Sequence, residues 1–98
     1  MALLQDILFK VNIRSVDGVT AVDIKDLQID SRTVTEGSVF IAIKGSSADG
    51  HRFIDTAIIN GAKSVICETL PSERKEGVTY VQVENSAAAA GYMAHNCH

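Results

Sequence analysis

The sequence has 98 residues, which is enough for one small domain and too few for two. Apolar residues make up 46% and charged residues 21%, so the composition excludes a disordered acidic tail, a collagen-like repeat and a coiled coil. Nine Lys and Arg residues against 12 Asp and Glu residues give a net charge of −3. These charges are interspersed without a basic stripe, so we expect neither nucleic acid nor an anionic membrane surface as a partner.

We expect no targeting segment at the N-terminus. Asp6 interrupts its apolar residues and no basic stretch precedes them, which argues against a signal peptide. No apolar run approaches the ~20 residues of a membrane span, so we expect no membrane span and a cytoplasmic protein. Cys67 lies in an apolar run and is predicted to be a buried thiol, and the chain has no CxxC pair. His95, Cys97 and His98 could bind a metal, but we interpret this terminal cluster as accidental and predict no metal site.

Hydrophobic spacing predicts an α/β fold in which a small mixed sheet contains a βαβ unit and is flanked by helices. The βαβ unit begins at the buried strand near residue 39 and ends near residue 68. Asn85 or Ser86 is the expected cap of the last helix. In chain order, the predicted elements are a helix over 2–9, an irregular or hairpin-like connection over 11–25, a half-buried strand around 27–29, a turn over 33–37, a strand over 39–43, a loop over 44–50, a helix over 53–58 stopped by Gly61, a strand over 64–68, a polar loop over 69–77, a strand over 78–83 and a helix over 86–94.

Two loops are candidate ligand sites. Asp30-Ser31-Arg32 closes a predicted strand, where the serine could hydrogen-bond a polar ring and the arginine could face an anion. The alternative is an Asp-Ser turn with an arginine ion pair. The loop from Gly45 to Gly50 leads from a buried strand into a helix, so its amides could receive a phosphate or a polar ring. It is neither a P-loop nor a GxGxxG motif, and a strand-to-helix turn that needs two glycines also explains it.

The remaining polar and aromatic residues indicate no catalytic set. His51 has no partner in the sequence that would make it a general base, so a surface or capping role is expected. Tyr80 and Tyr92 fit a strand face and a helix face and are predicted to be core residues. The acidic residues of the polar loops are predicted to be solvated, and they form no paired-carboxylate site.

Taken together, the ordered segments resemble a known family. Ile29-Asp30-Ser31-Arg32, the run from Val39 to Gly45, and Asp49-Gly50-His51-Arg52-Phe53-Ile54 occur in an order that resembles the N-terminal domain of the Mur ligases, the ATP-dependent amide ligases of peptidoglycan synthesis. The resemblance is close over residues 24–68 and looser elsewhere. Within the family, the chain is most similar to the MurE branch, which adds the third stem-peptide residue. The MurF branch, which adds D-Ala-D-Ala, shares these motifs and remains an alternative.

The resemblance implies that the domain docks the UDP part of UDP-N-acetylmuramoyl-L-Ala-D-Glu. Carried over residue by residue, the implied contacts are Ile29 and Ser31 from the first loop and Ser46, Ser47 and Ala48 from the second. Asp30 and Arg32 retain a structural interpretation. The serine hydroxyls and free backbone amides of the two loops could match the donor and acceptor edge of uracil, with Ile29 providing apolar contact.

The resemblance also implies an ATP- and Mg²⁺-dependent ligase whose central and C-terminal domains lie outside residues 1–98. We therefore expect a fragment with no cofactor and no ligase activity of its own, whose partners are the nucleotide substrate and those two domains. A stand-alone nucleotide-sugar-binding or interaction module, and a plain α/β domain with similar turns, are the alternatives. A Gly-Lys-Thr loop encoded after His98 would favour the docking domain, and a stop codon there would favour the module.

Overall fold

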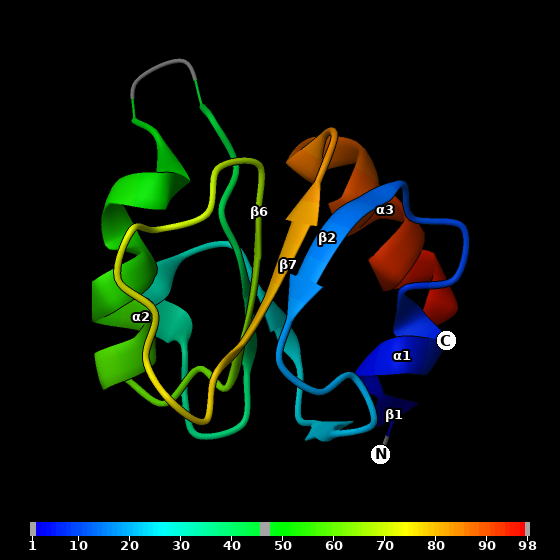
Figure 1. Cartoon of the computed structure of the whole chain (residues 1–98), viewed down its shortest axis with the longest axis horizontal. Helices are drawn as coiled ribbons and strands as arrows, with labels where there is room; N and C mark the ends of the chain where they lie inside the picture. Colours follow the sequence, from blue (N-terminus) through cyan, green and yellow to red (C-terminus); the bar gives the residue numbers. More distant parts are fainter. Residues whose placement is uncertain (1, 46–47, 98) are drawn as a thin grey trace.

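The computed structural model describes residues 2–45 and 48–97, and a five-stranded sheet forms its centre (Figure 1). The strand order is β2-β7-β6-β5-β4, in which β4 to β7 are parallel and β2 is antiparallel to β7. The predicted α/β class with a small mixed sheet is confirmed. The strands are β1 (Ala2–Leu3), β2 (Ile13–Asp17), β3 (Asp23–Ile24), β4 (Leu27–Gln28), β5 (Val39–Ile41), β6 (Ser64–Cys67) and β7 (Thr79–Val83), and β1 pairs with β3 apart from the main sheet.

Helices cover both faces of the sheet. α2 lies on one side, and α1 and α3 lie together on the other (Figure 1). Among the described residues, no helix is long and apolar enough to cross a membrane. The helical segments are α1 (Leu4–Ile7), the 3₁₀ turn η1 (Ser31–Thr33), the 3₁₀ turn η2 (Gly50–Phe53), α2 (Ile54–Ile59) and α3 (Ser86–Asn96).

Two apolar cores follow from the alternation of side chains along the strands. On β5, Val39 and Ile41 belong to the core beneath α1 and α3, whereas Phe40 belongs to the core beneath α2. On β7, Val81 and Tyr80 divide between the two cores in the same way. Burial on both faces explains why these strands are nearly continuous apolar runs in the sequence.

The predicted βαβ unit is confirmed as β5-α2-β6, with β5 and β6 adjacent and parallel. Gly61 follows α2 with φ of +121°, and Gly37 lies in the turn predicted over residues 33–37 with φ of +89°. Both residues adopt a positive φ, which glycine tolerates better than other residues. Asn85 is the N-cap of α3, and its side chain accepts a hydrogen bond from the backbone N–H of Ala88 at 2.9 Å.

The N-terminal predictions were partly wrong. The helix expected over residues 2–9 is confined to α1, because Ala2–Leu3 forms a strand that pairs with β3. The connection expected over residues 11–25 contains β3 and the whole of β2. β2 is an edge strand with four of its five residues exposed, so its sequence carries no burial pattern that would reveal it.

Two further expectations about burial were wrong. The strand predicted around 27–29 ends at Gln28, and the Ile29 residue is 63% exposed rather than half-buried. Tyr92 is 47% exposed on α3, whereas Tyr80 is buried as predicted. Hydrophobic spacing identifies a helix without fixing how far its apolar face extends around the axis, which accounts for Tyr92.

Cys67 is a buried thiol, as predicted, whereas Cys97 is exposed. Burial raises the pKa of the Cys67 thiol to about 11, which removes the reactive thiolate at neutral pH. We expect an aqueous thiol reagent to modify one cysteine in the folded protein and two after denaturation. Quantified labelling with mass spectrometry checks this, with Cys97→Ser as the control that should leave the folded chain unlabelled. Equal labelling rates for the two cysteines would contradict the buried position.

Candidate functional site

The two candidate loops meet in one pocket of about 500 Å³. Because β4 and β5 are parallel neighbours, the segments that follow them leave the sheet at the same edge, where ligands bind in α/β folds. Ile29, Ser31 and Ala48, predicted from the sequence, all line the pocket, whereas Ser46 and Ser47 lie outside the described residues. The full lining is Ile29, Asp30, Ser31, Arg32, Ile43, Ala48, Gly50 and Phe53.

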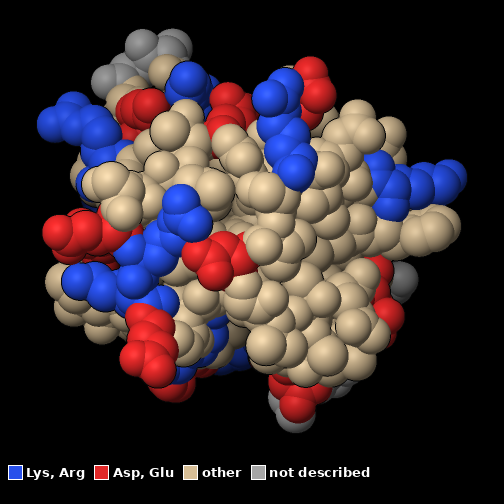
Figure 2. Space-filling view, in the orientation of Figure 1, with Lys and Arg blue, Asp and Glu red and all other residues tan. Residues whose placement is uncertain are grey.

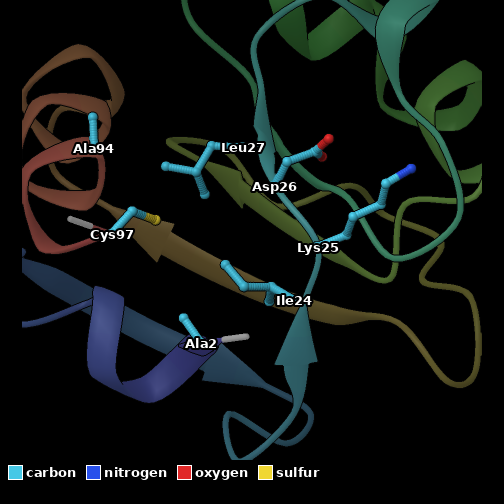
Figure 3. A pocket seen from close by; sticks show the side chains of 7 residues that line it. All are labelled: Ala2, Ile24, Lys25, Asp26, Leu27, Ala94 and Cys97. Carbon is cyan, nitrogen blue, oxygen red and sulfur yellow. The ribbon is translucent and has the colours of Figure 1, made fainter.

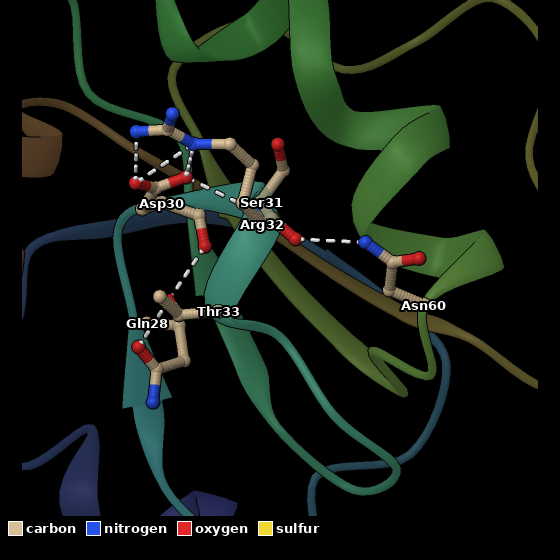
Figure 4. Close-up of polar contacts among 6 residues, drawn as sticks. All are labelled: Gln28, Asp30, Ser31, Arg32, Thr33 and Asn60. Carbon is tan, nitrogen blue, oxygen red and sulfur yellow. Dashed lines mark hydrogen bonds and ion pairs between the residues drawn. The ribbon is translucent and has the colours of Figure 1, made fainter.

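Asp30 and Arg32 hold the first loop in shape, as the structural interpretation predicted (Figure 4). The Asp30 carboxylate accepts hydrogen bonds from the Arg32 backbone N–H at 2.9 Å and from Arg32 Nη2 at 2.8 Å. Thr33 Oγ1 donates to Gln28 Oε1 at 2.6 Å and fixes the loop to the end of β4. The guanidinium is thus tied to its own loop while one side of it faces solvent and the pocket rim.

Ser31 is the polar group that the turn presents to the pocket. Its backbone carbonyl accepts a hydrogen bond from Asn60 Nδ2 at 2.9 Å, which joins the turn to the end of α2. Figure 4 shows its hydroxyl pointing away from the Asp30–Arg32 pair. Within residues 2–45 and 48–97 this hydroxyl has no hydrogen-bond partner, so it is available to donate to or accept from a ligand.

The Asp30–Arg32 contact gives a titration prediction. Hydrogen bonds from the Arg32 side chain and then its backbone N–H lower the pKa of Asp30 from 3.8 to about 2. Because the folded-state pKa is depressed, the stabilisation is present above pH ~4 and is lost as the pH falls through about 2. We expect Arg32→Ala to raise this pKa only part of the way, because the backbone N–H at position 32 still donates.

Side-chain NMR titration of the Asp30 carboxyl measures this change. The pair is exposed, so added salt should also raise the pKa in the wild type. An unchanged Asp30 midpoint in Arg32→Ala would show that the ion pair does not form in solution.

Part of the apolar lining comes from residues that the sequence did not assign to a site. Ile43 follows β5, and Phe53 ends η2 and is 41% exposed instead of packing in the core. Gly50 lies against the segment that follows β5, since an added Cβ would stand 2.7 Å from the backbone N of Ile43. The one signal in the sequence was the position of Gly50 and Phe53 at the junction of loop and helix, where residues from both can reach a ligand.

A second pocket of about 540 Å³ lies between the end of α3 and the segment from β3 to β4 (Figure 3). Its Lys25 and Asp26 side chains turn away from Cys97. Lys25 Nζ donates a hydrogen bond to Thr35 Oγ1, and the Asp26 carboxylate accepts one from the Ser38 hydroxyl. The charged side chains of this pocket are therefore already hydrogen-bonded, whereas the pocket at Ser31 has a hydroxyl with no partner among residues 2–45 and 48–97.

Charge and metal ligands add little to either pocket. On the face shown in Figure 2, Lys and Arg side chains are interspersed with Asp and Glu side chains and do not gather into one basic area. In the described part of the chain, no group of three or more His, Cys, Asp or Glu residues is arranged to hold a metal ion. The site can therefore offer hydrogen bonds, apolar contacts and single charges.

Comparison with known proteins identifies the family. A model described as "Mur ligase family, catalytic domain" matches residues 23–97. The chain belongs to the Mur ligase family. A curated relative from Cytophaga hutchinsonii, named UDP-N-acetylmuramoyl-L-alanyl-D-glutamate--2,6-diaminopimelate ligase, is 46% identical over 94 residues, which cover 95% of this chain and 19% of the relative. A relative of the same name from Bacteroides thetaiotaomicron is 39% identical over 94% of this chain and 19% of its own length.

Solved Mur ligase structures share the fold. MurF from Acinetobacter baumannii superposes with a TM-score of 0.78 over 96% of this chain and 20% of its own chain, at 22% identity, which supports the fold alone. MurF from Thermotoga maritima, solved in complex with ADP, has a TM-score of 0.63 over 71% of this chain and 16% of its own, at 36% identity. The chain thus spans about a fifth of the length of the Mur ligases that it matches.

Proposed function

We propose that this chain is the substrate-docking N-terminal domain of a Mur ligase and that it binds the UDP part of UDP-N-acetylmuramoyl-L-Ala-D-Glu. The observation that carries the proposal is the shared pocket: Ile29 and Ser31 and, from the other loop, Ala48 meet there although the loops are separated in sequence. The proposed contacts of Ser46 and Ser47 lie in the same loop, outside the described residues.

The chemistry of the lining suits a nucleotide base and its phosphates. The Ser31 hydroxyl and the backbone groups near Ala48 can pair with the donor and acceptor edge of uracil, while Ile29 and Phe53 supply apolar surface. Arg32 lies at the rim, where its outward N–H groups can reach a phosphate while Asp30 holds the side chain. Selectivity for uracil would come from the hydrogen bonds, since apolar contacts do not distinguish bases strongly.

The complete ligase would add the third stem-peptide residue in peptidoglycan precursor synthesis, in the cytoplasm. The names of the relatives at 35–46% identity favour this MurE-type assignment. The 36% identity to MurF from Thermotoga maritima supports the alternative D-Ala-D-Ala-adding ligase. By the resemblance to the family, ATP and Mg²⁺ would be bound by the central and C-terminal domains of such a ligase. The chain alone should form no peptide bond.

A backbone-amide NMR titration of the chain tests the docking role. UDP-N-acetylmuramoyl-L-Ala-D-Glu should shift the amides of Ile29–Ser31 and Ala48–Gly50 saturably, and GDP-mannose should not. Shifts scattered over the surface, or equal shifts with both sugar nucleotides, would overturn the proposal. In the full-length product, the amino acid consumed with ATP and this nucleotide would separate the MurE-type from the MurF-type activity.

A conservative variant sharpens this test. Ser31→Ala removes only the hydroxyl, and we expect affinity for the nucleotide to fall about three- to tenfold, the usual effect of one lost hydrogen bond. Ser72→Ala is the matched control, because Ser72 is exposed in the loop after β6, away from the pocket. Equal affinities for the Ser31→Ala and Ser72→Ala variants would exclude a contact from the Ser31 hydroxyl.

A further inference from the structure

His51 occupies a position that neither of its expected roles, surface or capping, describes. Only 13% of its side chain is exposed, at the start of η2 and directly after the pocket residue Gly50. The Asp49 carboxylate accepts hydrogen bonds from the His51 backbone N–H at 3.0 Å and lies 2.7 Å from Nδ1 of the ring. The other ring nitrogen, Nε2, accepts hydrogen bonds from the backbone N–H groups of Glu68 at 2.9 Å and Thr69 at 3.3 Å.

These partners determine the protonation state of the ring. A backbone N–H can only donate, so Nε2 must present its lone pair to Glu68 and Thr69. The ring proton must then be on Nδ1, where it donates to Asp49. A doubly protonated ring would turn an N–H toward two other N–H groups and lose both hydrogen bonds at once.

The same contacts join the pocket to the C-terminal end of β6. The Gly50 backbone N–H donates to the Ile43 carbonyl at 2.8 Å and holds the loop to the segment after β5, and His51 joins the loop to the backbone that follows β6. From there the Glu68 side chain accepts hydrogen bonds from the backbone N–H and hydroxyl of Ser86, at the first turn of α3. The position of the loop and the start of α3 are therefore linked through residue 68.

We propose that His51 is a positioning residue for the pocket: as the neutral Nδ1–H tautomer it fixes the loop Ala48–Gly50 against the end of β6, and protonation at Nε2 releases the loop. Its effect on nucleotide affinity rests on the function proposed above, whereas its hydrogen-bonding state does not.

Several charged groups surround the ring and set the balance between its two states. The carboxylates of Asp49 and Glu68 attract a positive ring, and the ammonium group of Lys44, in the segment after β5, attracts both carboxylates. Arg52 and Asp55 line the shallow pocket beside His51 together with the loop after β6. Against the attraction of the two carboxylates, the neutral ring retains both hydrogen bonds to Nε2 in a largely buried position.

Imidazole ¹⁵N NMR on the 98-residue chain reads the tautomer directly. At about pH 8 we expect His51 to give the Nδ1–H pattern, whereas an exposed histidine such as His95 should favour the opposite tautomer. When acid adds the second proton to the ring, the amide shifts of Ala48–Gly50 and Glu68 should change together with the ring signals of His51. An Nε2–H tautomer at high pH, or loop amides that do not follow the ring, would overturn the proposal without reference to any ligand.

Variants with UDP as the probe test the consequence for binding. His51→Ala should weaken UDP binding about tenfold near neutral pH, because two hydrogen bonds that hold the loop are lost. His51→Gln keeps an acceptor that can reach Glu68 and cannot become charged. We expect it to stay within about threefold of the wild type and to lose the pH dependence shown by the wild type. His95→Gln is the matched control and should behave as the wild type.

The outcomes separate the two proposals. If the wild type shows the Nδ1–H tautomer and coupled loop amides but does not bind UDP, the docking function fails and the positioning role stands. If UDP binds with equal affinity to the wild type and a folded His51→Ala variant, the docking function stands and the positioning role fails. Retention of the wild-type pH dependence by His51→Gln would also exclude His51 as the titrating group.

Discussion

Gly61→Ala should destabilise the protein by about 3 kcal/mol, and the same change at Gly91 should stabilise it by about 0.5–1 kcal/mol. Gly61 has φ of +121°, which side chains rarely adopt, and its added Cβ would lie 2.6 Å from Cα of Glu36. Neither the backbone of Glu36 nor that of the following turn can withdraw easily, because the Gly37 backbone N–H donates to the Gly61 carbonyl at 3.0 Å. Backbone strain and steric overlap therefore both contribute to the loss of stability in Gly61→Ala.

Gly91 is the matched control because it lies within α3 and an added Cβ would meet nothing within 4 Å. Alanine there reduces the conformational freedom of the unfolded chain without disturbing the folded one. Urea unfolding followed by circular dichroism gives both free energies. If the two variants shifted the midpoint in the same direction, the backbone conformation at Gly61 or the open space at Gly91 would be wrong.

Phe40→Ala should have a similarly large effect, about 3–5 kcal/mol of destabilisation. The Phe40 side chain is fully buried on β5, between its parallel neighbours and beneath α2, where it contributes to one of the two cores. Its removal loses the apolar transfer energy and leaves a cavity that the surrounding strands cannot fill. A domain of this size has about 5–15 kcal/mol of stability in total, so much of the variant should be unfolded at modest urea concentrations.

Phe9→Ala provides the control for the same chemical change at a position that is 64% exposed. We expect its free energy of unfolding to lie within about 0.5 kcal/mol of the wild type. Equal decreases in the free energy of unfolding for the Phe40 and Phe9 variants, measured by the same urea titration, would contradict the assignment of Phe40 to the core. A Phe40→Leu variant should recover part of the loss, because it refills most of the volume.

The sequence was sufficient where local chemistry and burial agree. The continuous apolar run of β5 and the helix stop at Gly61 predicted the βαβ unit, because a strand covered on both faces has few polar positions. The Asn85 cap of α3 was also predictable, since a short polar side chain before a helical stretch satisfies its first N–H groups. The motif order predicted the family that the comparisons identify.

The sequence was insufficient where pairing partners are distant. β2 pairs with β7 some seventy residues later along the chain, and its exposed residues carry no sign of that contact. The short pairing of β1 with β3 likewise replaced the first turn of a predicted helix, because backbone hydrogen bonds to a neighbour outweighed a weak helical preference.

The candidate site was likewise predictable only in part from the sequence. The sequence alone determined that Ser31 and the loop near Ala48 carry polar groups at the ends of strands, because strand-end loops are recognisable from composition. Only the tertiary structure brought those loops to one pocket and added Phe53 and Ile43 to its lining, since parallel pairing of β4 with β5 sets which ends are adjacent. It also decided the role of His51, because a histidine's protonation state depends on the donors that surround it, and Glu68 and Thr69 reach the ring only in the folded chain.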